Sequence, residues 1–337
     1  MTGFGDGHDE LRAVARDLLA GTAGWDKLAQ AGWLGLEVPE ELDGAGATFA
    51  EVAVVLEEMG RAAACTAYLG AVVLGVGTLN ALKPGRGRDE LLAATADGSV
   101  VPTVAIGDPP FRIEGSRVSG RAEFVPDAAE AGRILLPALD QTGTPVIVPV
   151  DAGALGCVRQ EVLDTTRAVG VVTADHVEAP EVWRFAGDPA AALRRISDRA
   201  AVAVACDSLG VAAAMLDRTV AYAGVREQFG RPIGSFQAVK HACADMMVKL
   251  AMSRQLVDAA CRAIAGDDDE AGAAASMAKS YACGAAVEIA GKAMQLHGGI
   301  GYTWESGIHV YLKRAAFNRA LFGSAAGHRK RLAARYF

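Results

Sequence analysis

The stretch VREQFGRPIGSFQAVKHACADM, residues 225–246, joins two helical segments and carries side chains suited to a large planar ligand. Arg226 presents a planar fork of donors that fits phosphate oxygens. Phe229 offers an apolar face to an aromatic ring, and Gln237 can donate to and accept from an amide-like ring edge. Taken alone, the block favours a simpler interpretation, in which the arginine and the glutamine cap a helical hairpin over buried phenylalanines.

A second block, QLHGGIGYTWE, covers residues 295–305. Together the two blocks favour a ligand-binding site over a capped helical hairpin. Gly298 and Gly299 follow the end of a predicted helix, and paired glycines let backbone N–H groups approach an anion. A plain glycine cap of the helix is the alternative. The block is not a dinucleotide-binding fingerprint, because no strand precedes it and the spacing G-x-G-x-x-G is absent.

The composition indicates a soluble globular protein of more than one domain. The chain has 337 residues, of which 51% are hydrophobic and 22% charged, enough for a sizeable core. The formal net charge of -7 argues against nucleic-acid binding. The six cysteines form no C-x-x-C pair, which favours free thiols in a reducing compartment over a metal site or disulfides.

Targeting and membrane signals point the same way. The N-terminus has neither the basic nor the apolar region of a signal peptide. Residues 62–82 carry no charge and are long enough to span a bilayer, but their glycines and polar residues favour a buried helix pair. We therefore expect a cytoplasmic protein with no membrane segment and no metal.

Three segments differ in pattern and predict an α+β multidomain fold. Residues 1–97 read as a helical domain, in which Val52, Val55, Leu56 and Met59 share one helix face and Gly60 can cap the helix, as the spacing shows. Residues 98–188 contain at least five short strand-like runs, typical of a small β barrel or sandwich. Residues 189–337 are helical again and are expected to form a four-helix bundle that carries both blocks.

Over nearly its whole length the chain resembles the acyl-CoA dehydrogenase family. The two blocks carry the resemblance, together with AGWLGLEVPEELDGAGATFAEVAVVLEEMGRA at residues 31–62. The resemblance implies that FAD is contacted from one subunit by Arg226, Phe229, Ile233 and Gln237. It implies that the pyrophosphate and adenosine side of the same FAD is contacted from the neighbouring subunit by Gln295, Gly298 and Gly299. Because two subunits contact one FAD, the resemblance also implies an oligomer.

The resemblance also implies a reaction, the α,β-dehydrogenation of an acyl-CoA thioester. In the family a glutamate removes the α-proton while a hydride leaves to flavin N5, and an electron-transferring flavoprotein reoxidises the flavin. Such a base needs a pKa raised toward neutrality by burial.

This chain departs from the family at the catalytic base. The common glutamate position is Phe322, which cannot accept a proton. The rarer position, on the preceding long helix, falls near Ala200, where Asp198 and Asp207 are the nearest and only weak candidates. The middle segment departs too, because Pro126 stands where the family places a group that bonds the flavin ring.

The losses concentrate on the catalytic side of the flavin, whereas the phosphate-side blocks remain. The chain thus resembles the shortened, glutamate-lacking subunit of actinobacterial α2β2 acyl-CoA dehydrogenases, several of which act on steroid side-chain thioesters. The implied partner subunit supplies the glutamate. The resemblance implies a place in the β-oxidation of fatty acids or steroid side chains. Two alternatives stay open: a self-sufficient homomeric dehydrogenase with an unconventional base, and a flavin-free, non-catalytic scaffold subunit.

Overall fold

The computed structural model describes residues 6–21 and 24–336, and their contacts group the chain into two compact units. The helical unit comprises Met1–Thr22, Ala53–Ala64 and Ala201–Phe337. The sheet unit comprises Ala23–Val52 and Cys65–Ala200. The helices–sheet–helices order along the chain confirms the predicted fold class. The boundaries at residues 97 and 188 stay a prediction, because the two units group distant parts of the chain.

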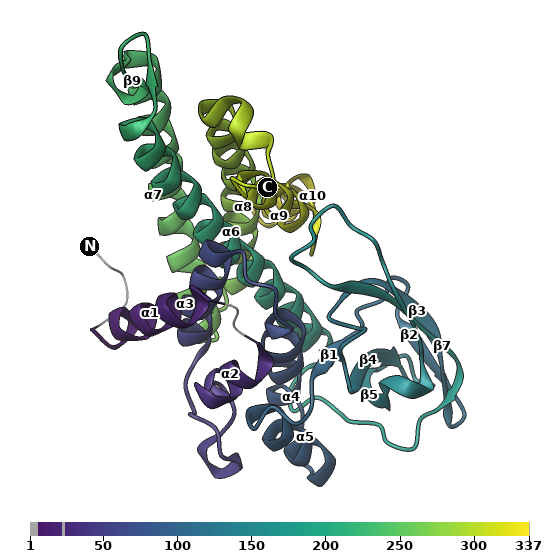
Figure 1. Cartoon of the computed structure of the whole chain (residues 1–337). Helices are drawn as coiled ribbons and strands as arrows, with labels where there is room; N and C mark the ends of the chain where they lie inside the picture. The colour runs from purple at the N-terminus through teal and green to yellow at the C-terminus, as the bar shows by residue number, and fades with distance from the viewer. Residues whose placement is uncertain (1–5, 22–23, 337) are drawn as a thin grey trace. The chain divides into compact units, whose positions relative to one another are not determined.

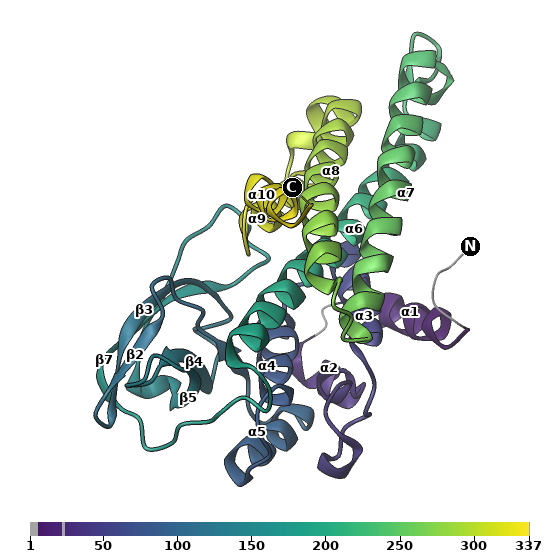
Figure 2. The same cartoon turned by 180° about the vertical axis from the view of Figure 1, so that it is seen from behind.

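The helical unit is built from long helices joined by short connections (Figure 1). Its elements are α1 (Asp6–Leu19), parts of α3 (Phe49–Ala62) and α6 (Pro189–Val225), β8 (Glu227–Gln228), β9 (Arg231–Pro232), η5 (Ile233–Ser235), α7 (Gln237–Ala265), α8 (Ala271–His297), η6 (Gly298–Tyr302), α9 (Ile308–Ala320) and α10 (Ala325–Tyr336). Helices α7 and α8 lie side by side in both views (Figure 2). The core between α6, α7, α8 and α9 includes Met215, Met246, Ile289 and Tyr311.

Helix α6 is long and largely apolar. Among the described residues it alone is long and apolar enough to cross a membrane, and 94% of its most apolar window is buried inside the protein. Residues 68–76 of the uncharged stretch 62–82 are also buried, but the stretch holds one helical run rather than the expected pair: η3 (Leu69–Val76), a π-helix, continues directly into α4 (Gly77–Asn80). Gly75 and Gly77 suit the helix interior here because Pro102 and Arg199 pack against them.

Helices α3 and α6 approach each other closely within the helical unit. The expected cap Gly60 lies inside α3, which continues to Ala62, so the sequence prediction was wrong on this point. A β-carbon at Gly60 would lie 1.9 Å from the carbonyl oxygen of Asp207, and one at Gly210 would lie 1.8 Å from that of Glu57. The two glycines therefore allow backbone contact between the helices.

The sheet unit carries all the long strands. Its elements are α2 (Trp25–Gln30), η1 (Trp33–Gly35), η2 (Glu40–Leu42), η3, α4, α5 (Arg86–Ala96), β1 (Pro102–Val104), β2 (Phe111–Glu114), β3 (Arg117–Pro126), β4 (Arg133–Leu139), β5 (Pro145–Asp151), η4 (Ala152–Ala154), β6 (Gly156–Arg159) and β7 (Val169–Glu178). Within residues 24–336 they form one seven-stranded mixed sheet in the order β1-β4-β2-β3-β7-β6, with β5 paired to β4. Every predicted strand-like run contains a strand, and β6 is additional.

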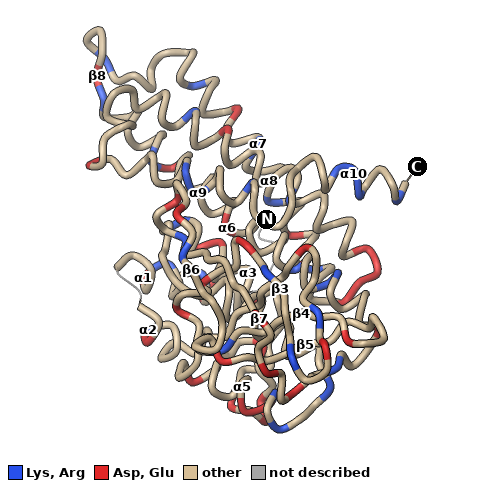
Figure 3. The backbone as a smooth tube through the Cα atoms, turned by 90° about the vertical axis from the view of Figure 1, so that its right-hand side faces the viewer, with Lys and Arg blue, Asp and Glu red and all other residues tan. Residues whose placement is uncertain are grey.

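The sheet encloses an apolar core that explains its strand patterns. In β2 the side chains of Phe111 and Ile113 point inward and alternate with exposed residues, as one buried face requires. The central residues of β4 and β5 are buried without alternation. Along the backbone, acidic and basic residues are largely interspersed. The two runs of three or more like charges are the acidic residues 267–270, which directly precede α8, and the basic residues Arg329, Lys330 and Arg331 on α10 (Figure 3).

Candidate functional site

The first block forms a two-residue hairpin at the end of α6. Strand β8 pairs with β9, and the residues between them, Phe229 and Gly230, both have positive φ angles of 53° and 74°. Such angles are typical of the tight turn that joins two antiparallel strands. The side chain of Phe229 is 92% exposed, and its ring meets the ring of Phe236 edge-on at 6.1 Å. The hairpin thus holds an unusual exposed aromatic side chain.

In this block, hydrogen bonds hold the backbone at Arg226, whereas the side chains of Arg226 and Gln237 make no such contacts within the described residues. The N–H of Arg226 donates to Tyr222 O at 2.8 Å, and Arg226 O accepts from the N–H of Ile233 at 2.7 Å. Gln237 begins α7. Within the described residues the side chains of Arg226 and Gln237 are exposed and have no hydrogen-bond or ion-pair partner. Both are therefore available to a ligand.

The second block lies at the C-terminal end of α8. Gly298 ends the helix with a φ of 64°. A β-carbon at Gly298 or at Gly299 would meet no atom within 4 Å, so the backbone there is open to close approach. The Oε1 atom of Gln295 accepts a hydrogen bond from Lys292 Nζ at 2.8 Å. A cation, an amide and open backbone N–H groups can together receive an anion.

The structure brings the two blocks to the same end of the helical unit. The ring of Tyr222 on α6 stacks on the ring of His297 on α8, with centroids 4.4 Å apart. Tyr222 lies one turn before Arg226, and His297 directly precedes Gly298. His297 is buried, and its Nδ1 pairs with Ala293 O at 2.8 Å, so it has a local structural role. Sequence reasoning missed Tyr222, which no motif signals.

Phe322 lies in a turn held by buried polar groups. Phe322 and Gly323 have positive φ angles of 56° and 98°. The Nζ of Lys279 donates to the carbonyl oxygens of Asn318, Arg319 and Gly323 at 2.9, 3.0 and 3.1 Å. Burial lowers the pKa of Lys279. The turn is thus firmly anchored, but its side chain at position 322 offers no proton acceptor.

The two weak candidates for the base are both buried on α6. Asp207 is fully buried, and it accepts hydrogen bonds from Arg314 Nε at 2.9 Å, Arg314 Nη2 at 2.6 Å and Asn318 Nδ2 at 2.6 Å. This carboxylate serves as the counter-ion of a buried guanidinium. Asp198 is 6% exposed. The buried cations Lys279 and Arg314 were missed because their partners are distant in sequence and leave no local signal.

Pro126 is the last residue of β3 in the sheet unit. The carbonyl oxygen of Pro126 accepts from Thr103 Oγ1 at 2.7 Å. The N–H of Phe124, which lies in a bulge with a φ of 53°, donates to Gln160 Oε1 at 2.6 Å. Pro126 itself has neither an N–H nor a hydroxyl group to donate.

Comparisons with known proteins show the family to which the chain belongs. Residues 191–337 match the acyl-CoA dehydrogenase C-terminal domain, and residues 7–98 match the N-terminal domain of the same family. Acyl-CoA dehydrogenase IpdE2 of Mycolicibacterium smegmatis is 34% identical over 308 residues, which cover 91% of this chain and 86% of the relative.

Two solved structures are similar over the full chain. A variant of the Tcur3481–Tcur3483 steroid ACAD has a TM-score of 0.86 and 31% identity, and the match covers 98% of this chain and 97% of that one. The ChsE4–ChsE5 complex of Mycobacterium tuberculosis has a TM-score of 0.90 and 25% identity, with 99% and 98% covered. The chain therefore belongs to the acyl-CoA dehydrogenase family of flavoprotein oxidoreductases.

Proposed function

We propose that this chain is one subunit of a heteromeric FAD-dependent acyl-CoA dehydrogenase, whose partner subunit supplies the catalytic glutamate. The observation that carries the proposal is an asymmetry within the helical unit. Arg226, Gln237, Gly298 and Gly299 remain free to receive a ligand, whereas position 322 is a phenylalanine. Two similar structures are named for pairs of proteins, which supports assembly with an unlike chain.

The residues present fit a flavin dinucleotide. FAD, when bound, supplies a hydride acceptor for the β-hydrogen of the thioester. The guanidinium of Arg226 would neutralise a phosphate, and Gln237 would hydrogen-bond a polar edge of the ligand. Phe229 and Ile233 would cover apolar ring surface. On the other subunit's flavin, the amide of Gln295 and the N–H groups of Gly298 and Gly299 would hold the pyrophosphate.

A residue outside this chain must remove the α-proton of the thioester. Phe322 has no basic atom, and the carboxylate of Asp207 is committed to Arg314 and Asn318. A base must be ionised and accessible to the α-carbon. A carboxylate of the partner subunit meets this need, and an electron-transferring flavoprotein is the proposed electron acceptor.

An apolar surface of the helical unit supports assembly. Helix α7 exposes Met247, Val248 and Met252, whose exposed fractions are 65%, 60% and 51%. Val248 and Met252 lie one turn apart on the same face of the helix, and Met247 lies about 100° around the helix axis from Val248. Phe229 extends the set of exposed apolar residues toward the hairpin. Exposed apolar surface of this kind is typical of protein interfaces, and we propose that the partner subunit covers it.

The proposed substrates are acyl-CoA thioesters with bulky, ring-containing acyl groups. The support is the name of one similar structure, a steroid ACAD, at 31% identity over nearly the whole chain. Turnover of a steroid side-chain CoA thioester by the assembled enzyme, compared with a straight-chain thioester of similar length, tests this point. Equal or faster turnover of the straight chain would contradict it.

Arg226→Ala and Gln295→Ala are each expected to weaken flavin retention by the assembled enzyme about tenfold, because each removes a hydrogen bond to an ionised group. The measurement is the visible flavin absorbance per chain after gel filtration. Arg329→Ala, which removes an exposed arginine on α10, is the matched control and should keep its flavin. If both site variants retain full flavin, the assignment of these residues is wrong.

A further inference from the structure

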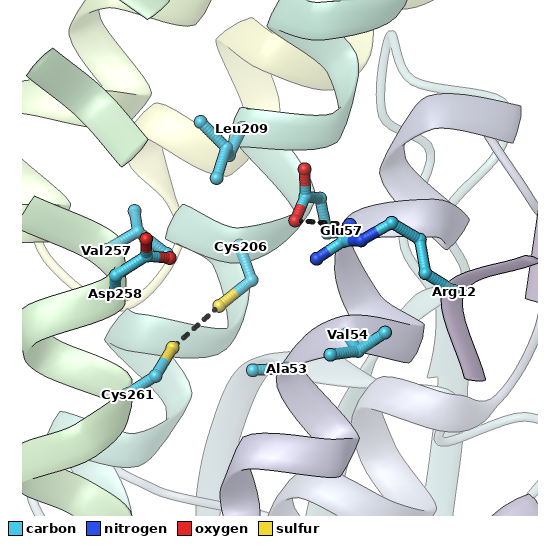
Figure 4. Close-up of a pocket in the computed structure, with 9 residues that line it drawn as sticks. All are labelled: Arg12, Ala53, Val54, Glu57, Cys206, Leu209, Val257, Asp258 and Cys261. Atoms are coloured by element: carbon cyan, nitrogen blue, oxygen red, sulfur yellow. Dashed lines mark hydrogen bonds and ion pairs between the residues drawn. The ribbon is translucent and has the colours of Figure 1, made fainter. Parts of the chain in front are cut away.

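Two cysteine side chains meet where α6 and α7 pack together. The Sγ atoms of Cys206 and Cys261 are 3.5 Å apart, and each residue is 1% exposed. Figure 4 shows the two thiols pointing toward each other from neighbouring helices. Both are free thiols in this structure. Among the described cysteines, no other pair is in sulfur–sulfur contact.

A small cavity adjoins this thiol pair. Its volume is about 10 Å³, and its lining includes both cysteines together with Arg12, Glu57 and Asp258 (Figure 4). A space of this size holds one molecule of about the size of water. It therefore gives the sulfur atoms room to move. A disulfide needs the sulfur atoms to approach to about 2.05 Å, which is about 1.5 Å closer than they lie in this structure.

We propose that Cys206 and Cys261 form a redox-responsive cross-link between α6 and α7, with a hydroperoxide as the oxidant. In the first step one thiol attacks hydrogen peroxide, giving a sulfenic acid and one water. In the second step the other thiol attacks that sulfenic sulfur, giving the disulfide and a second water. The two thiols together lose two electrons and two protons, and the peroxide is reduced to two waters.

The surroundings of Cys206 and Cys261 set the rate at which peroxide oxidises them. The hydrogen bond to Cys261, together with burial, raises the pKa of Cys206 well above its ordinary value. Since the thiolate is the reactive form, oxidation is slow. The cross-link is therefore expected to form only under sustained exposure to peroxide.

The cross-link would enclose the chain between residues 206 and 261. This segment contains the end of α6, the β8–β9 hairpin and the start of α7, and so it contains Arg226, Phe229 and Gln237. A disulfide restricts the unfolded chain and stabilises the folded one. Oxidation is therefore expected to stabilise the helical unit, whether or not flavin is bound.

The test uses the wild-type chain, treated with hydrogen peroxide and digested under non-reducing conditions. We expect one disulfide-linked peptide pair containing Cys206 and Cys261, reversible by dithiothreitol. The midpoint of thermal unfolding should rise by roughly 5–10 °C. The proposal is overturned if exposed Cys65 is oxidised while both Cys206 and Cys261 remain as thiols, or if Cys206 and Cys261 join other cysteines instead.

Variants sharpen the test. Cys206→Ser and Cys261→Ser should each abolish the rise in the thermal midpoint on oxidation. Cys283→Ser is the matched control, because Cys283 is equally buried but its sulfur contacts Ser208 and the carbonyl of Val204 rather than another thiol. It should keep the rise. A rise that persists in Cys261→Ser would contradict the proposal.

Discussion

Gly210→Ala is expected to lower the free energy of unfolding by at least about 3 kcal/mol. The added β-carbon would lie 1.8 Å from the carbonyl oxygen of Glu57 and 2.7 Å from the backbone nitrogen of Arg61. Both atoms belong to the backbone of α3, so no side-chain rotation can relieve the clash. The helices must separate, and the apolar contacts between them would be lost. Gly60→Ala should act similarly from the other helix.

Chemical denaturation, followed by circular dichroism, measures this effect. Gly284→Ala is the matched control, because Gly284 also lies within a helix, α8, but a β-carbon there meets no atom within 4 Å. Alanine is favoured over glycine in a helix by about 0.5–1 kcal/mol, so this variant should be neutral or stabilised. Equal effects at positions 210 and 284 would contradict the close helix contact.

Asp207→Ala is expected to destabilise the chain by about 3–5 kcal/mol, because it leaves the guanidinium of Arg314 buried without its counter-ion. Arg314 is 1% exposed, and Asn318 would also lose the shorter of its two side-chain hydrogen bonds. The double variant Asp207→Ala with Arg314→Met should recover much of the loss, since it removes the stranded charge. Thermal and denaturant unfolding gives the free energy of unfolding of the wild type, of Asp207→Ala and of the double variant for this comparison.

Asp217→Ala provides the control on the same helix. Asp217 pairs with Arg61 at the exposed surface, where an ion pair contributes at most about 1 kcal/mol. The experiment also bears on the homomeric alternative. If Asp207 were the catalytic base, Asp207→Ala would lose turnover while its stability stayed near that of the wild type. Such a result would contradict the structural role.

Hydrophobic periodicity predicted the long elements well. The apolar stripe at Val52, Val55, Leu56 and Met59 is buried in α3, and the strand-like runs became strands. Strand β6 was missed because its residues are largely exposed and carry no alternating pattern. The close crossing at Gly60 could not be predicted either, since a glycine near a helix end has the same local sequence whether it caps the helix or contacts another one.

The candidate site was predictable only in its separate parts. The residues of the two blocks were identified from motif and resemblance, and they lie at one end of the helical unit. What joins them is the stack of Tyr222 on His297, a tertiary contact without a local signal. The buried positions of Asp207 and Lys279 depend on which helices surround them. For this reason the sequence could suggest Asp207 as a base, although the structure surrounds it with donors.

The flavin content of the chain tests the central claim most directly. It should be measured on the chain purified alone and on the chain purified with a family member that carries the glutamate. Our account predicts far less than one FAD per chain for the isolated protein, and full flavin with acyl-CoA dehydrogenation for the assembly. Near one FAD per chain in the isolated protein, together with dehydrogenation of a thioester by that protein, would contradict it.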